Sequence, residues 1–346
     1  MNKNYLERER TQRLFSTFDQ NFKITHLYAT YLERFPDVIT KELVGLLTEG
    51  GGLTARDVIS ALLCEIFALD TENSPEDRAL FRNYILPSVR ILDPKRYTEN
   101  PYYKNIKLPD VKDGEWEFKN EVYPAYRGVI CHDMMISDDF CEIPPLGFFE
   151  EDFRFPAVLE GGNEWMTLTP VDLDTSDEAI AAAHGKVVTF GLGLGYYAYM
   201  VSEKDTVDSI TVVEKSEKVI ELFTKYVLPF FSHPEKVRIV NADAFEYAER
   251  IMPGECFDLA FVDTWRDASD GAPMYRRMKA LEHLAPNTQF MYWIENFLIS
   301  NIRAQKLISI KEAYNNGDRE LSYDEMVREL NIDRIKQSLR EVKGTE

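Results

Sequence analysis

Three glycines at alternate positions follow a short apolar run in the middle of this sequence. The run is Val187–Phe190, and Gly191, Gly193 and Gly195 come after it, before a helical pattern that begins at Tyr196. Glycine adopts positive φ angles without strain, and its missing Cβ lets a ligand approach the backbone closely. The first turn of the following helix offers free N–H groups. This pattern predicts a ligand-binding loop between a buried strand and a helix.

An acidic residue follows each of three later apolar runs: Glu214 after Ser209–Val213, Asp243 after Val237–Val240 and Asp263 after Phe257–Val262. A carboxylate at the end of a strand can accept two hydrogen bonds from the hydroxyl groups of a ribose. Parallel strands place their carboxyl ends at one edge of a sheet, where α/β proteins bind ligands. The spacing therefore indicates a nucleoside site, with Glu214 as its ribose ligand.

The glycine pattern resembles the first motif of class I S-adenosylmethionine-dependent methyltransferases. A dinucleotide fingerprint needs a third glycine where this chain has Tyr196. The resemblance covers about residues 185–296 and implies S-adenosyl-L-methionine as the cofactor. In that family the glycines shape the methionine pocket. The acids that match Glu214 and Asp243 bind ribose and adenine, respectively. The cofactor-binding residues that it implies are Gly191, Gly193, Gly195, Tyr196, Glu214, Lys215, Asp243, Ala244 and Asp263.

The layout is also similar to that of spermidine synthases, which have a hairpin before the sheet, as we expect here at 155–169. Their fourth strand is followed by an acidic loop that resembles Asp263–Asp267. The matching aspartate in those enzymes helps to deprotonate or position the attacking amine, which implies a catalytic role for Asp263. They also carry an aspartate within the glycine motif to hold the amine of decarboxylated S-adenosylmethionine, where this chain has Leu194. Loss of that charge-assisted partner favours ordinary S-adenosylmethionine.

We therefore expect a transferase that moves a methyl group from S-adenosylmethionine to a small-molecule acceptor by in-line displacement. Aminopropyl transfer is one alternative. A non-catalytic protein that binds the nucleoside and uses its helical regions for protein partners is another. A nicotinamide oxidoreductase is disfavoured by Tyr196. The five histidines show no metal-ligand spacing, so no metal is expected.

Apolar runs alternate with helical patterns over residues 155–300, which predicts βαβ units and a Rossmann-like, mostly parallel sheet. Strands are expected at 187–190, 209–213, 237–240, 257–262 and 289–294, and helices near 196–203, 217–228, 244–251 and 273–283. No strand pattern follows the fifth run. The sheet is thus expected to be truncated, or to have its edge completed by the hairpin.

The remaining parts of the chain read mostly as helix. Leu14, Phe18, Tyr28 and Tyr31 recur at three- and four-residue spacings, which is typical of an amphipathic helix. We expect a helical N-terminal domain (1–92), an irregular connector with short strands (93–154), the Rossmann-like cofactor-binding domain with its leading hairpin (155–300) and a helical tail (301–346). The fold class is therefore α/β.

The connector contains Asn100-Pro101-Tyr102-Tyr103, which is similar to the Asn-Pro-Pro-Tyr motif of amino-methylating enzymes. It lacks the second proline and lies outside the predicted sheet, so we assign it no catalytic role. The side chains expected to face the substrate are those of Tyr196, Tyr197, Trp165, Asp263, Trp265 and Glu295.

The composition of the chain disfavours some classes of binding partner. The chain has 40 basic and 59 acidic residues and a formal net charge of −19, which disfavours nucleic-acid binding. No apolar run is long enough to span a bilayer. The four cysteines form no paired motif, which is typical of reduced thiols in a cytoplasmic protein. We expect a small-molecule substrate, and helical regions that form a homodimer, cap the site, or do both.

Overall fold

The computed structural model describes residues 3–317 and 321–341. The chain forms two compact units, each assembled from separate segments. The first comprises Met1–Pro94, Val122–Phe153 and Ile299–Ile335, and the second comprises Lys95–Glu121, Arg154–Leu298 and Lys336–Glu346. The chain passes between these units after residues 94, 121, 153, 298 and 335, and the four predicted domains stay a prediction.

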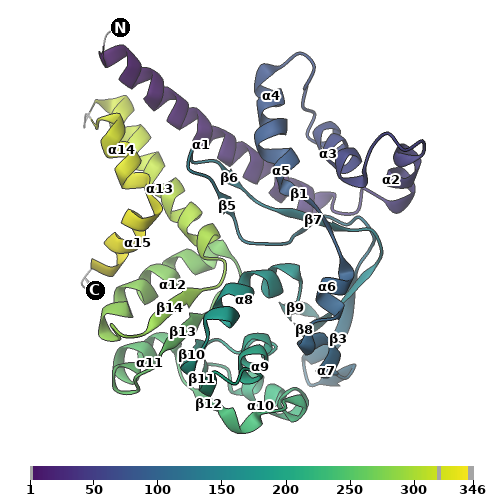
Figure 1. Cartoon of the computed structure of the whole chain (residues 1–346), viewed down its shortest axis with the longest axis vertical. Helices are drawn as coiled ribbons and strands as arrows, with labels where there is room; N and C mark the ends of the chain where they lie inside the picture. The colour runs from purple at the N-terminus through teal and green to yellow at the C-terminus, as the bar shows by residue number, and fades with distance from the viewer. Residues whose placement is uncertain (1–2, 318–320, 342–346) are drawn as a thin grey trace. The chain divides into compact units, whose positions relative to one another are not determined.

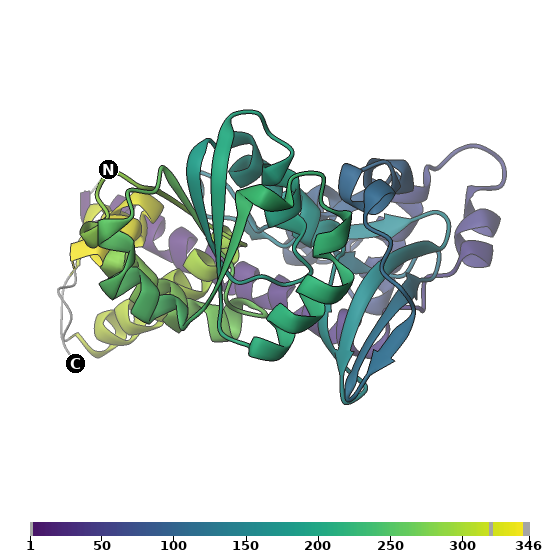
Figure 2. The same cartoon turned by 90° about the horizontal axis from the view of Figure 1, so that it is seen from below.

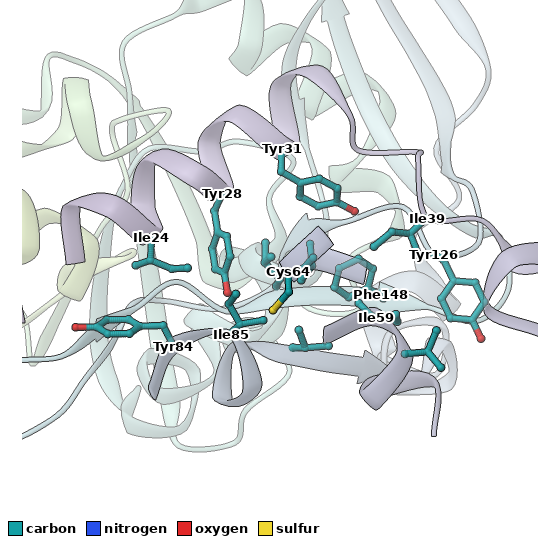
Figure 3. Packing of buried hydrophobic residues seen from close by; sticks show 14 of the residues in the cluster. Ile24, Tyr28, Tyr31, Ile39, Ile59, Cys64, Tyr84, Ile85, Tyr126 and Phe148 are labelled. Carbon is teal, nitrogen blue, oxygen red and sulfur yellow. The ribbon is translucent and has the colours of Figure 1, made fainter. Parts of the chain in front are cut away.

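Helices dominate the first unit. Those of its N-terminal segment are α1 (Lys3–Arg34), α2 (Lys41–Thr48), α3 (Ala55–Ile66), α4 (Pro75–Leu80) and α5 (Leu86–Ser88), with a π-helical turn at Phe81–Ile85. The predicted amphipathic pattern forms the single helix α1, which buries Leu14, Phe18, Ile24, Tyr28 and Tyr31 at successive turns. Figure 3 shows the last three of these side chains directed into a core that also contains residues of α3 and β7.

Short strands complete the first unit. Strand β1 (Val89–Leu92) pairs in parallel with β7 (Leu146–Phe149), which pairs in antiparallel with β4 (Val129–Ile130). A separate pair joins β5 (Met135–Ile136) to β6 (Glu142–Ile143). Every residue of β7 is buried, and Gly147 packs where a Cβ would lie 2.5 Å from Leu92 and 2.7 Å from Cys131.

The second unit contains a five-stranded parallel sheet in the order β12-β11-β10-β13-β14. Its strands are β10 (Gly185–Phe190), β11 (Val207–Glu214), β12 (Val237–Asn241), β13 (Leu259–Val262) and β14 (Gln289–Tyr292). All five lie within or close to the predicted runs. The α/β class and the mostly parallel sheet predicted from the sequence are confirmed.

Strand β10 is the central strand of this sheet. The chain adds β11 and β12 on one side of it and then crosses over to add β13 and β14 on the other side. Val187 pairs with Ile210 of β11 and with Leu259 of β13, and Val187–Phe190 is fully buried. Because parallel crossovers are right-handed, α9 (Tyr196–Ser202) and α10 (Glu217–Tyr226) cover one face of the sheet. By the same rule α11 (Ala244–Arg250) and α12 (Ala268–Leu281) cover the other. The carboxyl ends of β10 and β13 therefore form the topological switch point, where such sheets bind ligands.

The predicted hairpin forms as β8 (Phe153–Glu160) and β9 (Asn163–Thr167), but it does not complete the edge of the parallel sheet. It belongs to a separate four-stranded sheet in the order β2-β3-β8-β9, with β2 at Val111–Asp113 and β3 at Trp116–Tyr123. Among the described residues the parallel sheet ends at β14. The other expectation, a truncated sheet, is the one that this structure matches.

Helices follow the sheet: α13 (Glu295–Asn316), α14 (Tyr323–Leu330) and α15 (Ile332–Glu341). In the second unit, two salt bridges join α15 to the region around β14. Lys336 pairs with Glu295, and Arg340 pairs with Glu282. Within the part of the chain that the structure describes, no helix has the length and apolar character to cross a membrane.

The remaining short elements of the second unit are α6 (Pro94–Thr98), α7 (Pro101–Asn105) and 3₁₀ turns at Leu228–Phe230, Pro234–Lys236, Met252–Gly254 and Glu282–Leu284. Helix α8 (Pro170–Ala182) joins the hairpin to β10 and packs against α9. Figure 1 labels α6, α7 and α8, and Figure 2 gives a second view of the same chain.

Candidate functional site at the switch point

The glycine-rich loop after β10 has the backbone that its sequence predicts. Gly191, Gly193 and Gly195 have φ angles of 98°, 52° and 76°, in the region that side chains disfavour. A Cβ on Gly191 would lie 1.9 Å from the carbonyl oxygen of Asp263, and one on Gly195 would lie 2.3 Å from the ring of Phe223. The loop is thus closely packed on the end of β13 and on α10, and two of its glycines have no room for a side chain.

Glu214 ends β11 and bonds to the glycine-rich loop. Its Oε2 accepts a hydrogen bond of 3.1 Å from the backbone N–H of Leu192, and its Oε1 accepts one of 2.8 Å from that of Ser216. Each carboxylate oxygen has a second lone pair with which to accept a hydroxyl. The carboxylate is therefore fixed beside the loop with acceptor capacity left for a ligand.

Asp243 is the N-cap of α11, the helix that follows β12. Its Oδ1 accepts from the N–H groups of Phe245 and Glu246, and its Oδ2 lies 3.4 Å from the Lys215 ammonium. Burial opposes ionisation, but these hydrogen bonds and the lysine outweigh it and lower the pKa of Asp243. The group is thus ionised at neutral pH, with one oxygen committed to the helix and the other facing Lys215.

Asp263 follows β13 at the switch point itself. Its backbone N–H donates to the carbonyl of Phe190, 2.9 Å away, which joins it to the end of β10. Burial, with a smaller contribution from the negative charges of Asp172 and Glu214, raises the pKa of its carboxyl group to about 8. No donor among the described residues makes a hydrogen bond to this carboxyl group. It is a carboxyl group whose proton equilibrium lies near neutrality.

Asp263 lines a small cavity beside the loop that is partly open to solvent. The other polar side chains in its wall are those of Asp172, Ser176, Thr189, Tyr196 and Tyr197, with Trp293. The rest of the wall is apolar side chains and loop backbone: Met166, Leu168, Gly191, Leu192, Gly193, Leu194, Ala198 and Phe261. The wall therefore carries two carboxyl groups and no Lys, Arg or His.

The second carboxyl group, Asp172, was not among the predicted site residues. It closes a capping box at the start of α8, where its Oδ2 accepts from the N–H and the hydroxyl of Thr169 at 2.7 and 2.9 Å. Burial raises its pKa to about 6, although the bonds from Thr169 oppose the rise. The Thr169-x-x-Asp172 spacing indicates a helix start in the sequence. Nothing in that spacing places the aspartate beside β13.

The predicted substrate-facing groups divide into two sets. Tyr196 and Tyr197 line the cavity with Asp263, and the Tyr197 ring stacks on Phe261 at 4.3 Å between centroids. Trp165, Trp265 and Glu295 do not line it. Trp165 packs edge-on against Trp116 in a second, apolar cavity on the other side of Gly193, and Trp265 stacks on Tyr292.

Glu295 belongs to a buried charge network. It accepts from the Tyr275 hydroxyl at 2.7 Å and pairs with Lys279 and Lys336. Lys279 is 2% exposed, and it also pairs with Glu282 at 2.8 Å. Although burial opposes it, the two lysines lower the pKa of Glu295. These contacts give Glu295 a structural role at the start of α13.

The described residues contain no group of three or more His, Cys, Asp or Glu side chains placed to hold a metal ion.

The cavity lined by Asp172 and Asp263 can supply a proton acceptor, a negative potential and an apolar wall. These are the means to bind and deprotonate a nucleophile, and the loop and strand-end acids beside it are the means to bind a nucleoside.

No protein-family model matches this chain, and no curated protein sequence matches it. Similar solved structures include spermidine synthase from Thermotoga maritima, with 18% identity, a TM-score of 0.32 and coverage of 44% of this chain and 59% of that chain. A spermidine synthase in complex with the transition-state analogue AdoDATO has 19% identity, a TM-score of 0.32 and coverage of 44% and 60%.

The YcgJ protein from Bacillus subtilis has 17% identity, a TM-score of 0.26 and coverage of 34% and 49%. Each match spans less than two thirds of the solved chain and concerns the fold alone.

Proposed function

We propose that this chain binds S-adenosylmethionine at the carboxyl edge of its parallel sheet and transfers the methyl group to a small-molecule nucleophile. The arrangement of residues at the switch point supports this most strongly. A loop of three positive-φ glycines, the ribose-type acid Glu214 and the cavity acid Asp263 meet at the switch point between β10 and β13. Asp243 stands at the end of the neighbouring strand β12.

The residues at this edge fit an adenosyl group. Glu214 retains lone pairs for a ribose diol, and its bond to Leu192 fixes the distance between that diol and the loop. The Oδ2 of Asp243 is free of backbone donors and can accept from an exocyclic amine, in competition with Lys215. Gly191 and Gly193 border the cavity without side chains, so a sulfonium chain can lie against their backbone.

S-adenosylmethionine supplies an electrophilic carbon on a positively charged sulfur. The protein contributes alignment, removal of water and a base. As the acceptor's new bond to carbon forms, the carbon–sulfur bond would break and leave a neutral thioether, and ionised Asp263 accepts the proton that the acceptor's N–H or O–H group loses. A base whose pKa lies near the working pH is the most effective one, and a pKa of about 8 meets that condition.

Part of the cavity wall is apolar and buried. Leu194 is 2% exposed, and Phe261 is 1% exposed. In such surroundings an ionised carboxylate attracts a cation more strongly than it does in water. Correct alignment of two reactants can lower the barrier of such a displacement by roughly 7–11 kcal/mol.

Aminopropyl transfer is a second candidate, and the charge of the cavity favours it. Asp172 and Asp263 both face the space beside Leu194, and the wall has no basic residue. The carboxylate of S-adenosylmethionine would be repelled there, whereas the free ammonium of its decarboxylated form would be attracted. Asp172 thus offers, from α8, the negative charge that Leu194 does not provide within the glycine motif.

A transfer assay tests the proposal. The protein is incubated with S-adenosylmethionine or its decarboxylated form and a panel of amines, and products are identified by mass spectrometry. Methylated products from the first donor support methyl transfer, and aminopropylated products from the second support the alternative. The D263N variant should reduce turnover by at least about a hundredfold, in line with the loss of a general base. The matched control D208N changes an exposed aspartate of β11 and should retain turnover.

If neither donor is consumed while nucleoside binding persists, the chain is a binding protein and the enzymatic proposal fails.

A further inference from the structure

The segment that contains Asn100-Pro101-Tyr102-Tyr103 contacts both walls of the cavity. It forms the short helix α7 and is preceded by α6. The Tyr102 side chain is 1% exposed, and its hydroxyl donates a hydrogen bond of 2.6 Å to the carbonyl of Leu194 within the glycine-rich loop. This bond joins a residue outside the parallel sheet directly to the loop.

Further contacts connect α7 to the helix that follows the loop. The Tyr102 ring packs edge-on against Tyr196 and Tyr199 of α9, each at 5.6 Å between centroids. The Asn100 amide donates to the Tyr196 hydroxyl at 3.1 Å, and the Asn105 amide donates to the Tyr199 hydroxyl at 2.7 Å. The first turn of α9 is thus held by hydrogen bonds to the hydroxyls of Tyr196 and Tyr199 and by the Tyr102 ring, which packs against both.

The same segment connects to the wall that bears Asp172. The Tyr103 hydroxyl donates to the carbonyl of Leu168 at 2.6 Å, and Leu168 lines the cavity just before α8. Arg96 and Tyr97 of α6 bind Asp174 of α8 at 2.9 and 3.1 Å. Residues 96–105 therefore join α8 to the loop and α9, across the cavity that lies between them.

We propose that Tyr102, with Asn100 and Asn105, is a positioning residue that holds the glycine-rich loop and the first turn of α9 in the arrangement that a bound nucleoside requires. This inference rests on the proposed function for its ligand. The contact with the loop can be tested without any ligand.

The physical reason lies in the loop itself. Three glycines within five residues lose more backbone entropy on ordering than any other residue type would. A ligand that had to order such a loop would bind more weakly than one that met a loop already ordered. A buried donor on the carbonyl of Leu194 orders the loop in advance, and a ring packed on two tyrosines of α9 keeps the loop and the helix together.

The test compares Y102F, which removes only the hydroxyl, with Y84F. Tyr84 is a matched control in the other compact unit, because it is also fully buried and its hydroxyl also donates to protein acceptors, Asn21 Oδ1 at 2.8 Å and the Thr17 carbonyl at 3.3 Å. Two quantities are measured: amide hydrogen exchange of a peptide covering residues 189–199 without ligand, and the Kd for S-adenosylmethionine by calorimetry.

We expect Y102F to speed exchange in that peptide and to weaken binding by about three- to tenfold, the effect of one net hydrogen bond. Y84F should change neither quantity. Unchanged exchange in Y102F, or an unchanged Kd, overturns the inference. If the unsubstituted protein binds no nucleoside, the proposed function fails, and faster exchange in Y102F alone still supports the positioning role. Should Y102F not fold, N105A removes the bond to Tyr199 and is read by the same two measurements.

Discussion

Replacing Asp263 by asparagine should stabilise the protein at alkaline pH. In the folded chain, burial raises the pKa of Asp263 from its ordinary 3.8 to about 8, with Asp172 and Glu214 adding to the rise. In the unfolded chain the group ionises near pH 3.8. Between these values the folded protein holds a proton that the unfolded protein has lost. Stability therefore falls as pH rises through this window, and the loss is complete above about pH 8.

The size of the effect follows from the pKa difference. One pKa unit corresponds to about 1.4 kcal/mol, so a group fully removed from water would lose about 5–6 kcal/mol over the window. Asp263 is only half-buried, and it borders a cavity that opens to solvent. Screening by that solvent reduces the effect, and we expect D263N to gain about 1–3 kcal/mol relative to the unsubstituted protein between about pH 5 and pH 9.

Urea unfolding of both proteins at the two pH values, followed by circular dichroism, measures this difference. The control is D208N, which removes an exposed carboxylate from β11 and should leave the pH dependence of stability unchanged. If D263N and the unsubstituted protein lose stability in parallel between the two pH values, Asp263 does not hold a proton in the folded state. Its assignment as a base that titrates near neutrality would then be wrong.

Three further predictions concern the surroundings of this group. G191A should destabilise the fold by about 3 kcal/mol or more in thermal unfolding, because its Cβ would lie 1.9 Å from a carbonyl oxygen at a φ of 98°; the control G254A, with open space around it, should cost under about 1 kcal/mol. D172N should lower the pH at which turnover rises by about 0.5–1 unit, because a negative charge near Asp263 is lost; an unchanged pH–rate profile would contradict this. K279M should lower the free energy of unfolding by about 2–3 kcal/mol, because Lys279 is buried between two glutamates; a neutral result would show that Lys336 and Arg340 balance those glutamates alone.

The parallel sheet and its loop could be predicted from the sequence because their signals are local. Val187–Phe190 is a run of buried residues, and the alternating glycines after it are typical of a backbone with positive φ, which the structure has. The predicted strands at 209–213, 237–240 and 289–294 agree with β11, β12 and β14 to within a few residues for the same reason. Glu214 and Asp263 could then be placed at one edge from strand order alone.

The other half of the cavity could not be predicted, because long-range packing creates it. Asp172 has only a helix-capping signal in the sequence, and its approach to Asp263 depends on how α8 crosses the end of the sheet. The start of α12 was also missed. That helix begins at Ala268, five positions before the predicted start, because Asp267 caps it and Pro273 is accommodated within it. Likewise, α7 lies in a stretch that reads as irregular, and its contacts with Leu194 come from folding rather than from periodicity.

Calorimetric titration of S-adenosylmethionine into the unsubstituted protein, E214A and E217A tests the central claim most directly. Glu214 bonds to the glycine-rich loop, whereas Glu217 is exposed in the first turn of α10 and serves as the matched control. The account predicts micromolar binding that E214A weakens by about 1.5–3 kcal/mol, the contribution of a charge-assisted hydrogen bond, and that E217A leaves unchanged. Absence of binding, or equal binding by all three proteins, would contradict a nucleoside site at this edge of the sheet.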